Sequence, residues 1–121
     1  MNMATRREVE QFLNQFKVKI DIWGIFFLDE RGKNMQALLD LGITPSIREN
    51  VVKSIDVEDY SEGPIRDVLN DYGEMWVFGK DVNDVEVYIK ITMGRPESKT
   101  ICISFHKAEH PMKYPLKNER R

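Results

Sequence analysis

The sequence predicts an α+β protein in which N-terminal helices pack on a C-terminal antiparallel β-meander. Apolar residues recur at helical spacing in the first half of the chain, which predicts the helices. Residues 86–110 contain two alternating apolar and polar runs separated by a loop with Gly, Pro and Ser, which predicts a hairpin. No internal repeat, low-complexity tract or long linker divides the chain, so we expect residues 1–121 to form a single domain.

The first helix and the first strand are expected before residue 29. Thr5 and Glu8 form a capping-box pattern, and an apolar stripe follows at helical spacing, made of Val9, Phe12, Leu13 and Phe16. Residues 17–28 then alternate between apolar and polar before an apolar run. This alternation predicts a strand, in which Gly24 marks a bulge or a bend.

Two short helices are expected next. Asn34 can cap the first, and Gly42 marks its end. Thr44 and Pro45 repeat the start signal for the second, with proline in the first helical position. The side chains expected to face inward are Met35, Leu38 and Leu39 in the first helix and Ile47, Val51 and Ile55 in the second.

Residues 56–73 are the most acidic and least regular part of the chain. Gly63 and Pro64 interrupt them, and we expect a solvated connector with a helical turn or two over residues 64–70. Ile65, Val68 and Leu69 would face inward there. The alternative is a mobile flap over the sheet. Residues 75–78 predict a third strand, and residues 81–84 predict a turn.

The final hairpin selects its own register, because a slip of one residue would set polar side chains against apolar ones. The apolar faces pair if Met93 lies opposite Ile101, Ile91 opposite Ile103 and Ile89 opposite Phe105. The same register places Tyr88 opposite His106 and Lys90 opposite Ser104, while Cys102 joins the polar set. A phenol, an ammonium and an imidazole should therefore share one exposed face of the sheet.

The side chains on this face include the kinds of group that metal-free cleavage of RNA would use. Such cleavage needs a base for the 2′-hydroxyl, a cation for the phosphate and an acid for the leaving 5′ oxygen. His106 can serve as base or acid, since histidine titrates near neutral pH, and Tyr88 can donate a hydrogen bond or stack on a nucleobase. The expected contacts to RNA are Lys80, Lys90, Lys107 and His110. The alternative is that the outer face is polar only because water covers it.

The composition limits the expected partners and cellular location of the protein. The 121 residues are 41% hydrophobic and carry a net charge of −2, which argues against direct binding to DNA, although the basic residues gather after residue 99. The single Cys102 indicates a reducing compartment. We find no apolar signal region and no apolar run of membrane length, so we expect a cytoplasmic protein without a membrane partner.

The runs VYIKI at 87–91 and CISF at 102–105, preceded by Trp76 and by helices in the same order, resemble the MqsR toxins of bacterial type II toxin–antitoxin systems. Those toxins belong to the wider RelE/ParE-like fold. The resemblance implies an endoribonuclease that cleaves messenger RNA without a metal or another cofactor and that a cognate antitoxin holds inactive. Tyr88 matches the family's tyrosine. His106 and Val77 stand where the family has lysine and glutamine, and Glu62 falls near a second lysine.

These departures leave a second function open. A non-catalytic RNA- or protein-binding module could keep the fold and lose the nuclease residues. The face of the sheet on which Trp76 and Phe78 lie is also open. If Val77 faces the core, the two aromatic rings lie on the outer face and add surface for stacking on bases. The resemblance favours the opposite arrangement, with both aromatic rings buried.

Two further patterns in the sequence bear on a metal or a nucleotide cofactor. Residues 106–110 spell H-x-x-E-H, a zinc-protease motif that requires a helix, but His106 closes a strand and Pro111 follows His110. We therefore expect no metal. The glycines are scattered and form no phosphate-binding loop, so we expect no nucleotide cofactor.

Overall fold

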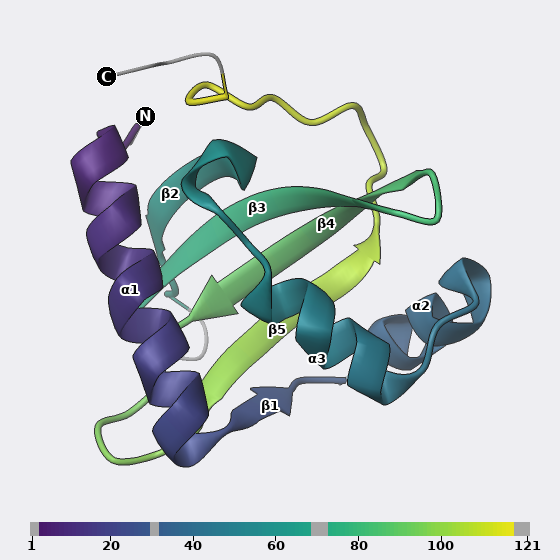
Figure 1. Cartoon of the computed structure of the whole chain (residues 1–121), viewed down its shortest axis with the longest axis horizontal. Coiled ribbons are helices and arrows are strands. Elements are labelled where there is room, and N and C mark those ends of the chain that lie inside the picture. The colour runs from purple at the N-terminus through teal and green to yellow at the C-terminus, as the bar shows by residue number, and fades with distance from the viewer. Residues whose placement is uncertain (1–2, 30–31, 69–72, 118–121) are drawn as a thin grey trace.

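The structure is a computed structural model that describes residues 3–29, 32–68 and 73–117. In these ranges the helices are α1 (Arg6–Trp23), α2 (Lys33–Leu41) and α3 (Pro45–Lys53), followed by the short 3₁₀ helix η1 (Val57–Asp59). The strands are β1 (Ile25–Phe27), β2 (Tyr60–Arg66), β3 (Glu74–Val82), β4 (Val85–Thr92) and β5 (Thr100–Lys107). Figure 1 shows α1 and α3 lying over one face of the sheet.

The strands form one five-stranded mixed sheet in the order β1-β5-β4-β3-β2. Strands β2 to β5 pair antiparallel in chain order, whereas β1 pairs parallel with β5 at the edge. The predicted α+β class is confirmed. The predicted simple meander is wrong, because the chain passes through α2, α3 and three strands before β5 returns beside β1.

Helix α1 is longer than the sequence indicated. The predicted capping box at Thr5 is present, but residues 17–23 are helical rather than a strand. Ile20 extends the buried stripe by one more helical turn, while Val18 and Ile22, which produced the alternation, are 57% and 65% exposed. Gly24 caps the helix with φ +88° and donates its N–H to the carbonyl of Ile20, so it is a helix end and not a strand bulge.

The predicted end of α2 and the predicted start of α3 are confirmed, but the inward faces of both helices differ from the prediction. Gly42 ends α2 in the left-handed conformation, and the Thr44 hydroxyl accepts the N–H of Ile47 at the start of α3. The N-cap position of α2 is Gly32 rather than Asn34, whose side chain turns into the core instead. Three residues that were expected to face inward are exposed instead, namely Met35, Leu39 and Ile47.

Residues 60–66 form the edge strand β2, where the sequence indicated a connector or a flap. Pro64 is accommodated because β2 pairs with only one neighbouring strand, so its missing N–H interrupts no second ladder. The predicted helical turn is therefore wrong over residues 64–66. Val68 is 83% exposed rather than inward, while Leu69 and Asn70 lie outside the described residues.

The core lies between the sheet and the helices. The ring of Phe12 on α1 stacks on Trp76 with centroids 4.6 Å apart, and it lies 6.3 Å from the ring of Phe78, which is two residues further along β3 on the same face. Both strand aromatics are buried, and Val77 points to the opposite face, which we call the outer face. This answers the question that the sequence left open, in favour of two buried aromatic rings.

The β4–β5 register agrees with the prediction at one end of the hairpin only. Tyr88 pairs with His106, Ile89 with Phe105 and Lys90 with Ser104, as predicted. Beyond Lys90 the register shifts, so that Ile91 pairs with Cys102 and the predicted Ile91–Ile103 and Met93–Ile101 pairs are wrong. A bulge adds one residue and reverses the alternation, which is why Cys102 is buried in the core and not on the polar face.

Candidate functional site

Tyr88 and His106 lie side by side on the outer face, away from the helices. Their rings stack with centroids 5.2 Å apart and an interplanar angle of 13°. Both side chains are partly exposed. The Nδ1 atom of His106 lies 2.9 Å from the carbonyl oxygen of Lys107, which can only accept a hydrogen bond. Nδ1 therefore carries a proton in this contact, and Nε2 is the nitrogen left to exchange a proton with a ligand.

The environment of Tyr88 favours its neutral form. Burial raises the pKa of the phenol, and the negative charges of Glu62 and Glu109 raise it further. The phenol thus keeps its proton well into the alkaline range and acts as a hydrogen-bond donor. This chemistry suits contact with a phosphate oxygen and does not suit a general base.

Lys90 extends the site along the sheet. It pairs with Ser104 on one side and with Val77 on the other, and Val77 pairs in turn with Glu62 on β2. Paired residues in a sheet point to the same face, so these four side chains form a row across the outer face, adjacent to the Tyr88–His106 row. Val77 has no exposed surface, whereas Glu62 is exposed. The outer face therefore presents a carboxylate, an ammonium and an imidazole on β2, β4 and β5.

A C-terminal strap, residues 108–117, lies next to the site and contacts the outer face at Glu86 on β4 and Gly79 on β3. Both carboxylate oxygens of Glu86 hold it, one accepting the N–H of Met112 at 3.2 Å and the other accepting the Tyr114 hydroxyl at 2.6 Å. Leu116, near the end of the strap, is 3% exposed. Figure 1 shows the strap in yellow as it leaves β5 and turns back toward the side of the sheet where β2 lies.

The strap depends on Gly79, which pairs with Tyr88 across β3 and β4. A Cβ at this position would lie 2.2 Å from the hydroxyl oxygen of Tyr114, so only glycine leaves room for that ring. Sequence reasoning missed Tyr114 and Glu86 as neighbours of the site. The sequence feature that could have indicated this contact is Gly79, because a glycine inside a strand often marks a place where another segment approaches closely.

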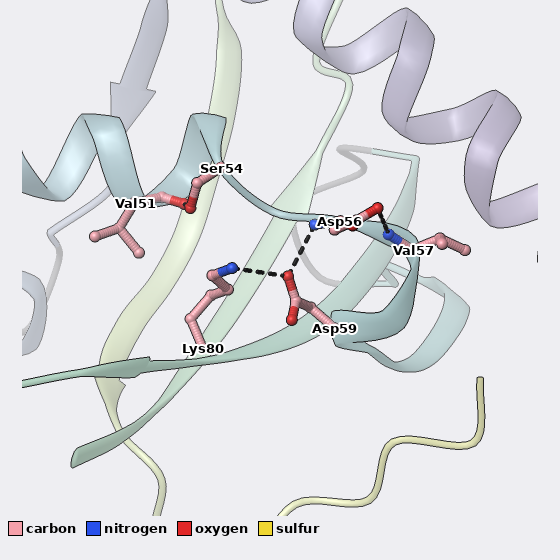
Figure 2. A network of polar contacts seen from close by, with 6 residues as sticks. All are labelled: Val51, Ser54, Asp56, Val57, Asp59 and Lys80. Carbon is pink, nitrogen blue, oxygen red and sulfur yellow. Dashed lines mark hydrogen bonds and ion pairs between the residues drawn. The ribbon is translucent and has the colours of Figure 1, made fainter. Parts of the chain in front are cut away.

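Two of the predicted RNA contacts lie on the other face. Lys80 and Lys107 both pair with Val87, whose buried side chain faces the helices. Figure 2 shows Lys80 reaching Asp59, with 3.1 Å between its Nζ and a carboxylate oxygen that also accepts the N–H of Asp56. The structure therefore joins Lys90, but neither of these lysines, to Tyr88 and His106.

His110 lies beyond β5 in a bend, with its side chain exposed. The H-x-x-E-H motif thus spans a strand end and a bend rather than a helix, and the helical geometry that its zinc chemistry requires is not formed. Within the described ranges, His, Cys, Asp and Glu side chains form no group of three that could hold a metal ion.

Asn34 supports the site from the edge of the sheet. Its side-chain oxygen accepts the N–H of Phe105 at 2.8 Å, and its amide nitrogen donates to the carbonyls of Leu28 and Ile103. Strand β1 ends at Phe27, opposite Cys102. Beyond that point, the Asn34 side chain makes the backbone hydrogen bonds to β5 that a longer neighbouring strand would make. It fixes the backbone immediately before His106. The sequence predicted a capping role for Asn34 and gave no sign of this one.

Comparison of the chain with protein-family models, with curated proteins and with solved structures found no match. Among the described residues, no helix has both the length and the apolar character that crossing a bilayer requires.

Proposed function

We propose that the chain is a metal-independent endoribonuclease that cleaves single-stranded RNA on the outer face of β4 and β5. The observation that supports this proposal is the stacked, partly exposed Tyr88–His106 pair with Lys90 two residues along β4. Together these side chains supply a proton-transfer group, a neutral hydrogen-bond donor and a cation. No metal is needed for the reaction proposed.

Each group has one role in this proposal. His106 transfers a proton through Nε2, because Nδ1 is engaged by the backbone of Lys107. Tyr88 donates a hydrogen bond to a phosphate oxygen, which agrees with the raised pKa of its phenol. Lys90 offsets the negative charge that grows on the phosphate in the transition state.

We further propose that the chain is a toxin of the MqsR type with a RelE/ParE-like fold, acting in the cytoplasm and held inactive by a cognate antitoxin. The VYIKI and CISF runs form the antiparallel β4–β5 pair, and Tyr88 lies on its outer face. If the proposal is right, expression of the chain alone arrests growth. Co-expression of the neighbouring open reading frame relieves the arrest.

The direct experiment measures cleavage of a labelled single-stranded RNA by the purified protein in EDTA. His106→Ala and Tyr88→Phe should each lower the rate by about 10²-fold or more, the usual contribution of a group that takes part in proton transfer or charge stabilisation. Lys90→Ala should also slow cleavage. The matched control is Lys53→Ala, which removes a lysine that pairs with Glu49 on α3. Wild-type rates in both His106→Ala and Tyr88→Phe contradict the assignment.

A non-catalytic RNA-binding module is the second candidate. Its specific support is Val77, which has no exposed surface and so cannot contact RNA where the toxins carry a glutamine. Glu62 adds to this support, because it stands near the position where the toxins carry a lysine. Binding of RNA without cleavage in the same experiment selects this second function.

A further inference from the structure

We propose that Glu62 is the general base of the site and that His106 is its general acid. This assignment rests on the proposed ribonuclease function and divides the two proton transfers of that reaction between two residues. It also gives a catalytic role to the position that differs most in charge from the toxin family.

The path of β2 directs Glu62 to the outer face. Tyr60 pairs with Phe78 on the helix-facing side, and regular antiparallel pairing from there would set Glu62 opposite Trp76, in the core. A register shift between Tyr60 and Glu62 sets it opposite Val77 instead. One extra residue in β2 thus moves the carboxylate to the face that carries Tyr88 and His106, as bulges often do beside active sites.

A second irregularity holds the strand in this position. The register shifts again between Glu62 and Ile65, and Gly63 lies between them with φ +126°. A Cβ on Gly63 would lie 2.9 Å from the carbonyl oxygen of Met75. Glycine therefore allows β2 to approach β3 closely, directly after Glu62.

The Glu62 carboxylate is available to a substrate. It is exposed, and no salt bridge joins it to another residue in the described ranges. Its charge nevertheless acts within the site, since it contributes to the raised pKa of the Tyr88 phenol. An exposed carboxylate that acts on a site residue without an ion pair of its own is suited to accept a proton.

The positions of the two groups match the geometry of the reaction. Glu62 lies on β2 and His106 on β5, three strand spacings or roughly 14 Å apart along the sheet at the backbone. Lys90 and Tyr88 lie on β4 between them. The attacking and leaving oxygens of an in-line displacement lie on opposite sides of phosphorus, so the base and the acid must approach a central phosphate from opposite sides.

The reaction then follows from these positions. Glu62 takes the proton of the 2′-hydroxyl as the 2′ oxygen forms a bond to phosphorus. The bond from phosphorus to the 5′ oxygen breaks, and the His106 imidazolium gives its Nε2 proton to that oxygen. The products are a 2′,3′-cyclic phosphate and a free 5′-hydroxyl, and the two side chains return to their starting states by exchanging protons with water.

The experiment compares two RNA oligonucleotides of the same sequence, one natural and one with sulfur in place of the bridging 5′ oxygen at the cleaved bond. A thiolate leaves without being protonated, so the modified RNA does not need the acid but still needs the base. His106→Ala should lower cleavage of the natural RNA by about 10²-fold or more and cleavage of the sulfur-containing RNA by less than about tenfold. Glu62→Gln should lower cleavage of both RNAs by about 10²-fold.

The matched control is Glu74→Gln, which changes an exposed carboxylate at the far end of β3 and should leave both rates unchanged. Circular dichroism of each variant verifies that it is folded. Wild-type rates in Glu62→Gln, or rescue of Glu62→Gln by the sulfur-containing RNA, overturn the base assignment and leave the nuclease standing. A wild-type protein that cleaves neither RNA overturns the proposed function itself.

Discussion

Replacement of Asn34 by leucine tests how the edge of the sheet is held. The change keeps the shape of the side chain and removes its polar atoms, so the N–H of Phe105 and the carbonyl of Ile103 lose the partner that Asn34 provides. Phe105 has no exposed surface, so water cannot replace the amide there. Each buried group left without a partner costs about 1–3 kcal/mol, so for these two groups we expect a loss of about 2–6 kcal/mol in the free energy of unfolding.

The assay is urea denaturation followed by tryptophan fluorescence, because Trp76 is 7% exposed and reports on the core. The midpoint should fall while the slope of free energy against urea stays unchanged. Asn14→Leu is the control, since Asn14 is exposed on α1 and its replacement should stay within about 0.5 kcal/mol of the wild type. A loss for Asn34→Leu no larger than that of the control refutes the role assigned to the amide.

Further predictions concern the strap, the Cys102 thiol and Lys80 on the helix-facing side of the sheet. Gly79→Ala should lower stability by about 1–3 kcal/mol, because the new methyl group displaces the Tyr114 ring, and a urea midpoint equal to the wild type's contradicts this contact. Burial raises the pKa of Cys102 from its ordinary 9.0 to about 12, so iodoacetamide at pH 8 should modify the unfolded chain but not the native one. The folded state holds this proton more tightly, so its contribution to stability is complete below about pH 9 and is lost as the pH rises toward 12; Cys102→Ala should flatten that part of the stability curve. Lys80→Ala should cost about 1 kcal/mol or less through its pair with Asp59 and leave RNA cleavage unchanged, and a large loss of cleavage contradicts its place on the helix-facing side.

The part of the site that the sequence predicted depends on local alternation. The pairing of Tyr88 with His106 and of Lys90 with Ser104 follows from matching apolar faces on two strands close in the chain. The same reasoning failed beyond Lys90, because a bulge changes which side each residue takes and leaves no fixed sequence pattern. Cys102 consequently lies in the core.

The remaining parts depend on contacts between distant segments. Whether Lys80 shares a face with Tyr88 depends on the register of β3 against β4. The sequence does not show this register, and on the helix-facing side the ion pair with Asp59 compensates the charge of the lysine. Val18 and Ile22 alternate with polar residues as in a strand, but the segment is helical, with Ile20 in the buried stripe of α1 and Val18 and Ile22 exposed. No local pattern indicates that a bulge turns Glu62 outward.

The most direct test of the proposed chemistry is the identity of the new ends when the purified chain is incubated with single-stranded RNA in EDTA. We predict fragments with a 2′,3′-cyclic phosphate at one end and a 5′-hydroxyl at the other, detected by mass spectrometry, and their loss in His106→Ala. Intact RNA, or the same fragments formed at the same rate by His106→Ala, contradicts the account of the outer face as a catalytic site.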